Sequence, residues 1–189
     1  MRRGPVPRRS VLVGLWLVAR GKAAGIACFG GDAQSFLSSL APLVAFPLVG
    51  AAAGLFTEGP GRALTDLAMT ICALLTPAVV SYELARVWKR TDAWLRFATA
   101  FNWCEWILPI LACLILVPLS VAITLGMTED AASLILLGSL GCYGLWLHWF
   151  LARNALSLSR IQAATLVFLV NLATVAVVLG PRLLVHGLA

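Results

Sequence analysis

The sequence has few charged residues. Only 12% of its 189 residues are Asp, Glu, Lys or Arg, and only two are histidine. Soluble domains contain about 25% charged residues, so this composition excludes an ordinary soluble domain. Apolar residues take their place, at 61% of the chain, and the mean hydropathy is +0.94. A lipid bilayer is the solvent that suits such a chain.

Enzymatic and metal-binding motifs are also missing from the sequence. It contains no G-x-S-x-G, H-E-x-x-H, Walker or Rossmann glycine pattern. The cysteines stand singly with no C-x-x-C pair, which is typical of small buried hydrophobic residues: Cys28, Cys72, Cys104, Cys113 and Cys142. We therefore predict no catalytic residue, metal or cofactor. An intramembrane enzyme stays open as a weaker alternative that would depend on His148 or a cysteine.

The formal net charge of +6 does not indicate nucleic-acid binding, because no basic stripe interleaved with aromatic residues is present. Lysine and arginine also hold short loops on the cytoplasmic side of a membrane. The charge therefore indicates topology, and we expect the lipid bilayer, not nucleic acid, as the surrounding partner.

Long apolar segments separated by turn residues predict an all-α membrane protein, a bundle of five transmembrane helices. The transmembrane domain is predicted over residues 31–182, with spans at about 33–56, 62–88, 103–126, 131–151 and 161–179. The segment from Asp92 to Gly126 exceeds one span, so its first part, TDAWLRFATAF, is predicted to lie at the interface. Gly180 and Pro181 are expected to end the fifth span, leaving residues 183–189 as a short periplasmic tail.

Residues 1–30 are predicted to form a basic tail and an N-terminal interfacial amphipathic helix. The apolar run from Val11 to Ala19 is about half the roughly 20 residues that a span requires. No clean A-x-A cleavage site follows it, although an uncleaved signal-like segment remains an alternative. The side chains expected to dip toward the acyl chains are Leu12, Leu15, Trp16 and Val18.

The positive charges predict the orientation. With a cytoplasmic N-terminus, only Arg62 and Arg182 lie outside. The other twelve lie inside: Arg2, Arg3, Arg8, Arg9, Arg20, Lys22, Arg86, Lys89, Arg90, Arg96, Arg153 and Arg160. We therefore expect a multi-pass protein of the bacterial inner membrane with its C-terminus in the periplasm.

Four polar residues are predicted to share one layer in the cytoplasmic third of the membrane: Glu83, Asn102, Glu105 and His148. Arg86 and Arg153 lie at a depth that suits counter-charges for the two glutamates. Pro109 lacks an N–H and is expected to free the carbonyl of Glu105. This layer is either a proton, ion or ligand site or a polar collar at headgroup depth, and the collar is favoured because a glutamate near the interface costs little.

Asn171 lies alone near the middle of the fifth span. A single asparagine at this depth usually donates a hydrogen bond to another helix, so we predict that it joins two helices.

Three stretches carry a pattern of breaks and polar residues around the spans: LWLVARGKAAGIACFGGDAQSF leading into the first span, FATAFNWCEW opening the third, and YGLWLHWFLARNALSLSRIQAATLVFLVNL joining the fourth and fifth. This pattern resembles that of the bacterial members of the Yip1-like group of five-helix membrane proteins. The resemblance implies a five-helix fold and supplies no catalytic residue. The predicted function is a non-enzymatic membrane organiser or a component that binds another membrane protein or a second copy. The alternative is a small transporter or channel subunit that uses the polar layer.

Overall fold

The computed structural model describes the backbone of residues 10–57 and 59–187 and the side chains of residues 10–57 and 59–180. This part of the chain consists of helices joined by short turns and loops and contains no strand. The elements are α1 (Val11–Ala19), the 3-10 helix η1 (Ala23–Cys28), α2 (Ala33–Thr57), α3 (Pro60–Val87), α4 (Thr91–Cys104), α5 (Ile107–Thr124), α6 (Glu129–Ala155) and α7 (Arg160–Gly187). The predicted tail at residues 1–9 lies outside the described residues.

Among the described residues, five helical segments are long and apolar enough to cross a membrane, which confirms the predicted number of spans. They are α2, α3, the composite of α4 and α5, α6, and α7. All of the observed helices begin or end within a few residues of the predicted spans, except at two places. The third span begins earlier, at Thr91, and α7 continues past Gly180 and Pro181. Prolines are tolerated inside membrane helices, as they are in α2, α3 and α5, so Pro181 does not end the helix.

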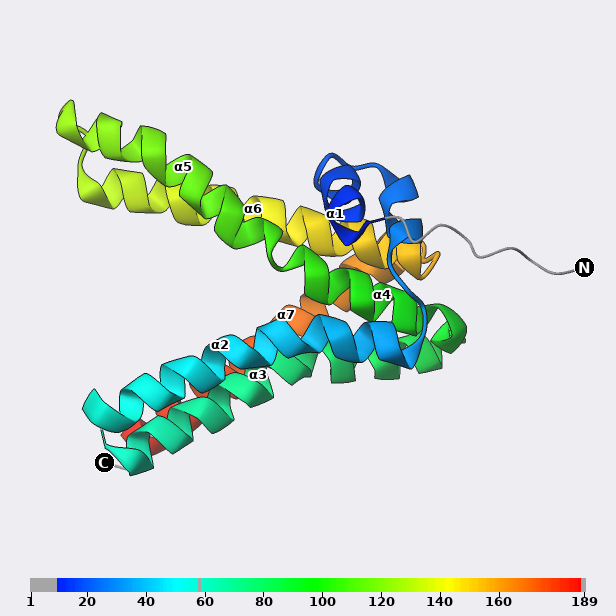
Figure 1. Ribbon diagram of the computed structural model, residues 1–189, viewed down its shortest axis with the longest axis horizontal. Helices are drawn as coiled ribbons and strands as arrows, with labels where there is room; N and C mark the ends of the chain where they lie inside the picture. The colour runs from blue at the N-terminus through cyan, green and yellow to red at the C-terminus, as the bar shows by residue number, and fades with distance from the viewer. Residues whose placement is uncertain (1–9, 58, 188–189) are drawn as a thin grey trace, which may run out of the picture.

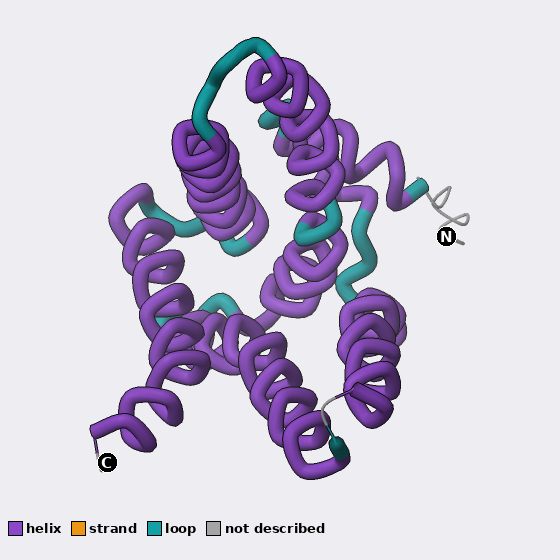
Figure 2. The backbone as a smooth tube through the Cα atoms, turned by 90° about the vertical axis from the view of Figure 1, so that its left-hand side faces the viewer, coloured by secondary structure: helices purple, strands orange, loops and turns teal. Residues whose placement is uncertain are grey.

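The helices form two arms and not a single closed bundle (Figure 1). One arm consists of α2, α3 and α7, and the other is the hairpin of α5 and α6. We call them the three-helix arm and the two-helix arm. They meet at the apex, which contains α1, η1, α4 and the adjoining ends of α6 and α7, and they diverge toward the open end. From that end, the loop between α5 and α6 and the C-terminus lie on opposite sides of the view (Figure 2).

The hydrophobic core lies at the apex. Its fully buried side chains include Val18 of α1, Phe97 of α4, Leu147 and Leu151 of α6 and Leu166 of α7. Along the arms, by contrast, many large apolar side chains are exposed. This division is expected in a bilayer, where lipid tails solvate apolar side chains as well as a protein core does.

Helix α4 is the central element of the apex. Seven of its fourteen residues are buried, so the stretch predicted to lie at the interface is packed within the protein. The indole of Trp94 donates a hydrogen bond to the Ser81 hydroxyl of α3 at 3.1 Å and packs against Phe36 of α2. Helix α4 thereby fastens the three-helix arm to the apex.

The break between α4 and α5 falls at Glu105 and Trp106. Pro109 cannot donate to the carbonyl of Glu105. The predicted free carbonyl is nevertheless absent, because the N–H of Leu108 donates to it at 3.3 Å. A tighter i+3 hydrogen bond therefore replaces the usual helical one, and this turn redirects the chain into the two-helix arm.

Helix α1 is apolar on all sides and so does not show the amphipathic character that we expected. Its faces differ in burial instead: Gly14 and Val18 are buried against the protein, whereas Leu12 and Trp16 are exposed. Val18 is fully buried, so it packs in the core and not among acyl chains. Three cysteines differ similarly from expectation, since Cys72, Cys113 and Cys142 are exposed on the arms.

Candidate functional site at the apex

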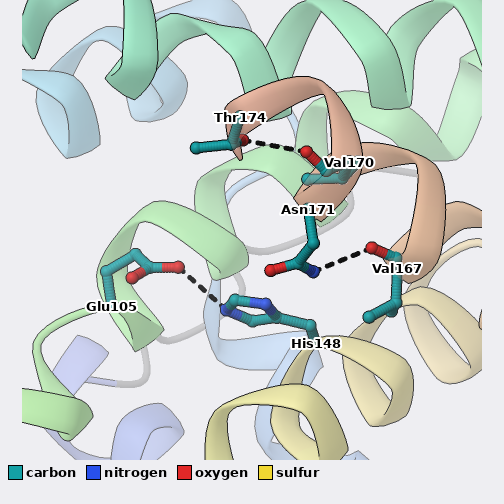
Figure 3. A network of polar contacts seen from close by, with 6 residues as sticks. All are labelled: Glu105, His148, Val167, Val170, Asn171 and Thr174. Carbon is teal, nitrogen blue, oxygen red and sulfur yellow. Dashed lines mark hydrogen bonds and ion pairs between the residues drawn. The ribbon is translucent and has the colours of Figure 1, made fainter. Parts of the chain in front are cut away.

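The structure brings two of the predicted polar residues together. Nε2 of His148 on α6 lies 2.9 Å from Oε1 of Glu105, at the break between α4 and α5. The His148 side chain is 17% exposed and that of Glu105 is 31% exposed. The pair therefore joins the break between α4 and α5 to α6, at the point where the two-helix arm leaves the apex (Figure 3).

The chemistry of the two groups determines which of them donates the hydrogen bond. An ionised carboxylate only accepts hydrogen bonds, so Nε2 of His148 is the donor when Glu105 is charged. The other ring nitrogen, Nδ1, is buried and has no hydrogen-bond partner among the described residues. The ring also packs against Phe101, with centroids 4.6 Å apart and an angle of 36° between the ring planes. The imidazole is held in place by Phe101 and Glu105 while one of its two nitrogens has unused hydrogen-bonding capacity.

Asn102 does not join this pair. Its side-chain amide donates to the Ser39 hydroxyl of α2 at 3.0 Å, and both residues are buried. The Ser39 hydroxyl in turn donates to the carbonyl of Phe36 at 2.7 Å. Asn102 therefore fastens α4 to α2, which satisfies its polar group inside the apex.

The charged residues of the predicted layer lie apart from Glu105. Glu83 and Arg86 form an ion pair with each other, 2.6 Å apart and one turn along α3, with both side chains largely exposed. The guanidinium of Arg153 lies over the ring of Trp149, 5.4 Å from its centroid, which is within the distance of a cation–π contact. The predicted layer and its counter-charges are thus divided among four separate groups of contacts.

Asn171 lies on the side of α7 that faces α6, and Figure 3 shows it in the neighbourhood of His148. Its amide donates to the carbonyl of Val167 in the same helix at 2.8 Å. This hydrogen bond stays within α7, so the helix-joining bond that we expected is not the one its amide forms. The carboxamide oxygen of Asn171, which can accept a hydrogen bond, lies on the His148 side (Figure 3).

Two residues of the site were missed by the sequence analysis. Ser39 is a small polar residue within an apolar helix, and Phe101 precedes Asn102 on α4. Ser39 could have been found from the sequence, because a buried amide such as that of Asn102 requires a hydrogen-bonding partner and Ser39 is a polar residue in a neighbouring apolar helix. For Phe101 no signal distinguishes it from the other aromatic residues around it, since its packing against His148 depends on how α4 crosses α6.

No protein-family model, curated protein or solved structure matches this chain. The site must therefore be interpreted from its own geometry. In the described residues, no group of three His, Cys, Asp or Glu side chains is placed to hold a metal ion. A hollow of about 210 Å³ between α2 and α3 is lined by Asp66, Thr70 and small residues, and none of the predicted site residues lines it. At the Glu105 and His148 pair, Nδ1 of His148 is the buried polar atom that has no hydrogen-bond partner among the described residues.

Proposed function

We propose that the protein is a non-enzymatic membrane component that organises the bilayer or binds a partner within it. The separation of the two arms supports this function best. Helix α5 packs mainly against α6 and presents a stripe of exposed apolar side chains at helical spacing: Ile110, Leu114, Val117 and Val121. Such a stripe can contact lipid or the apolar face of another membrane helix. The partner is another membrane protein or a second copy of this chain.

The proposed location is the bacterial inner membrane, with the N-terminus cytoplasmic and the C-terminus periplasmic. The loops at the apex and at the open end differ in charge in a way that supports this orientation. Lys89 and Arg90 lie in the turn before α4, and Arg160 begins α7, whereas Arg62 lies at the open end. Similarity to the bacterial Yip1-like group also belongs to this proposal and rests on the three stretches quoted above.

The test is purification of the tagged full-length chain in a mild detergent. We expect a stable partner or a dimer to co-purify, and the double substitution Leu114→Ala with Val117→Ala to weaken that association. The matched control is Leu134→Ala with Leu137→Ala, which removes equally exposed side chains from α6 and should leave it intact. Recovery of the chain as a lone monomer in every case would refute partner binding.

A second candidate function is transport, and the apex pair favours it. Glu105 and His148 form a hydrogen-bonded carboxylate and imidazole at a helix break, with Nδ1 buried and unused. Ionisable groups inside membrane segments commonly belong to ion or proton pathways. If the protein is a transporter, Glu105→Gln should abolish a flux measured in proteoliposomes while expression and folding are unchanged. Arg86→Gln, which alters an exposed ion pair, should leave the flux intact.

A further inference from the structure

The end of α1 is fixed against α6 by two contacts that are independent of the partner or transport function. The Tyr143 hydroxyl of α6 donates to the Ala19 carbonyl, at the end of α1, at 3.0 Å. Gly21, which follows with a φ of 70°, lies against Trp146. Because of these two contacts, Arg20 and Lys22 lie beside the segment of α6 that contains Tyr143 and Trp146.

Helix α1 is also held tightly on its inner side. A Cβ atom at Gly25 would lie 2.7 Å from the Gly14 carbonyl oxygen and 2.8 Å from Cβ of Leu17. Only glycine permits this approach, because contacts below 3.0 Å are not tolerated. Helix α1 and η1 therefore form one close-packed unit, and the exposed side of α1 is presented in a fixed orientation.

The depth of this unit in the bilayer follows from the length of α6. Tyr143 lies 14 residues after Glu129, which begins α6 beside Asp130 at the open end. At 1.5 Å per residue this is about 21 Å, less if the helix is tilted. The hydrocarbon core is about 30 Å thick. With the charged start of α6 at one surface, the end of α1 lies roughly 9 Å inside the opposite boundary.

The long side chain of Arg20 therefore has to extend toward the interface to bring its guanidinium to the edge of the hydrocarbon. Its guanidinium lies 5.1 Å from the centroid of the Trp16 ring, and Trp16 is 63% exposed. Among the described side chains, no carboxylate lies within ion-pair distance of Arg20 or Lys22. A cation at this depth is stabilised by a counter-charge, and a lipid headgroup is the anion that the surrounding membrane supplies.

We propose that Arg20 and Lys22 bind the phosphate of an anionic phospholipid in the leaflet that surrounds the apex. The exposed side of α1, formed by Leu12, Val13 and Trp16, contacts the acyl chains of the same lipid. An arginine suits this role because its planar guanidinium pairs with phosphate oxygens and stacks on an aromatic ring at the same time. We call this the α1 headgroup site.

The test uses the full-length protein, purified in an uncharged detergent and stripped of lipid. Dioleoyl phosphatidylglycerol is titrated, and binding is followed by native mass spectrometry and by the thermal unfolding midpoint. We expect phosphatidylglycerol to bind and raise the midpoint, and dioleoyl phosphatidylcholine to do so much less. Arg20→Gln and Lys22→Gln should each weaken phosphatidylglycerol binding by about five-fold, the effect of one cation near an anionic surface.

The matched control is Arg62→Gln, an exposed arginine at the open end of α3, which should retain the affinity of the unaltered chain. Two results would overturn the proposal. In the first, Arg20→Gln and Lys22→Gln bind phosphatidylglycerol as tightly as the unaltered protein or no more weakly than Arg62→Gln. In the second, inorganic phosphate alone stabilises the protein as much as the lipid. If a glutamine variant is less stable without lipid, its lipid count by mass spectrometry still decides between these outcomes.

Discussion

The hydrogen bond between Glu105 and His148 should contribute measurably to the stability of the apex. Each partner can be replaced by an apolar residue of similar size: Glu105→Leu removes the carboxylate, and His148→Phe removes both ring nitrogens while keeping the packing against Phe101. Each single substitution leaves a partly buried polar group unpaired. The double substitution leaves neither, so it should be less harmful than the sum of the two.

The magnitude follows from the geometry and exposure of the pair. Hydrogen bonds to charged groups contribute about 1.5–3 kcal/mol when they are shielded from water. The distance of 2.9 Å is close to ideal, but Glu105 is 31% exposed and His148 is 17% exposed. Water therefore weakens the interaction in part. We expect a coupling free energy of about 1–2 kcal/mol.

The measurement is a double-mutant cycle, with unfolding free energies obtained by titrating dodecyl sulfate into detergent micelles and following tryptophan fluorescence. The control cycle uses Glu83→Leu and Arg86→Leu, whose ion pair is largely exposed, and it should give no more than about 0.5 kcal/mol. A coupling at Glu105 and His148 as small as that of the control would refute the reasoning, since the substitutions would then be additive.

Three further predictions concern the fold around the site. Asn102→Ala should lower the unfolding free energy by about 1 kcal/mol in the same titration, because it removes the buried bond to Ser39; an unchanged free energy would contradict this role. Gly25→Ala should cost about 1–3 kcal/mol by overpacking against Gly14. Gly138→Ala, where an added Cβ meets nothing within 4 Å, should cost nothing, and equal effects at both glycines would show that steric contact is not the cause. Hydrogen bonds from the backbone N–H and the hydroxyl of Ser35 lower the pKa of Asp32 below its usual 3.8. This cap at the start of α2 therefore stabilises the protein above that pH and is lost as the pH falls through the lowered pKa, so the unfolding midpoint of Asp32→Asn should vary less with acidification than that of the unaltered chain.

Local sequence features sufficed for most ends of the spanning helices, with the start of the third span and the end of α7 as exceptions. The span of α2 was predicted as residues 33–56 and is observed as Ala33–Thr57, because apolar length and turn residues determine where a membrane helix begins and ends. The position of residues 92–102 could not be predicted in the same way. Their alternation of charged and aromatic residues is typical of an interfacial segment, and it also suits a helix that packs against several neighbours, as α4 does.

The candidate site shows the same division. Sequence alone identified Glu105 and His148 as polar residues at a common depth, because depth follows from the number of residues along a helix. That Glu105 pairs with His148, while Asn102 turns to Ser39 and Glu83 to Arg86, depends on the directions in which the side chains leave their helices. Those directions are set by the crossing of α4 with α2 and α6, which no local pattern contains.

The sequence by itself therefore determined that a bilayer suits this protein and how many of its described helical segments are long and apolar enough to cross one, since both follow from composition and from the length of the apolar segments. Only the tertiary structure decided that the spans divide into two arms, that the core lies at the apex, and that Arg20 lies over the Trp16 ring with no carboxylate of the described side chains at ion-pair distance. The physical reason is that lipid solvates apolar faces as well as protein does, so hydrophobicity does not specify which helices meet.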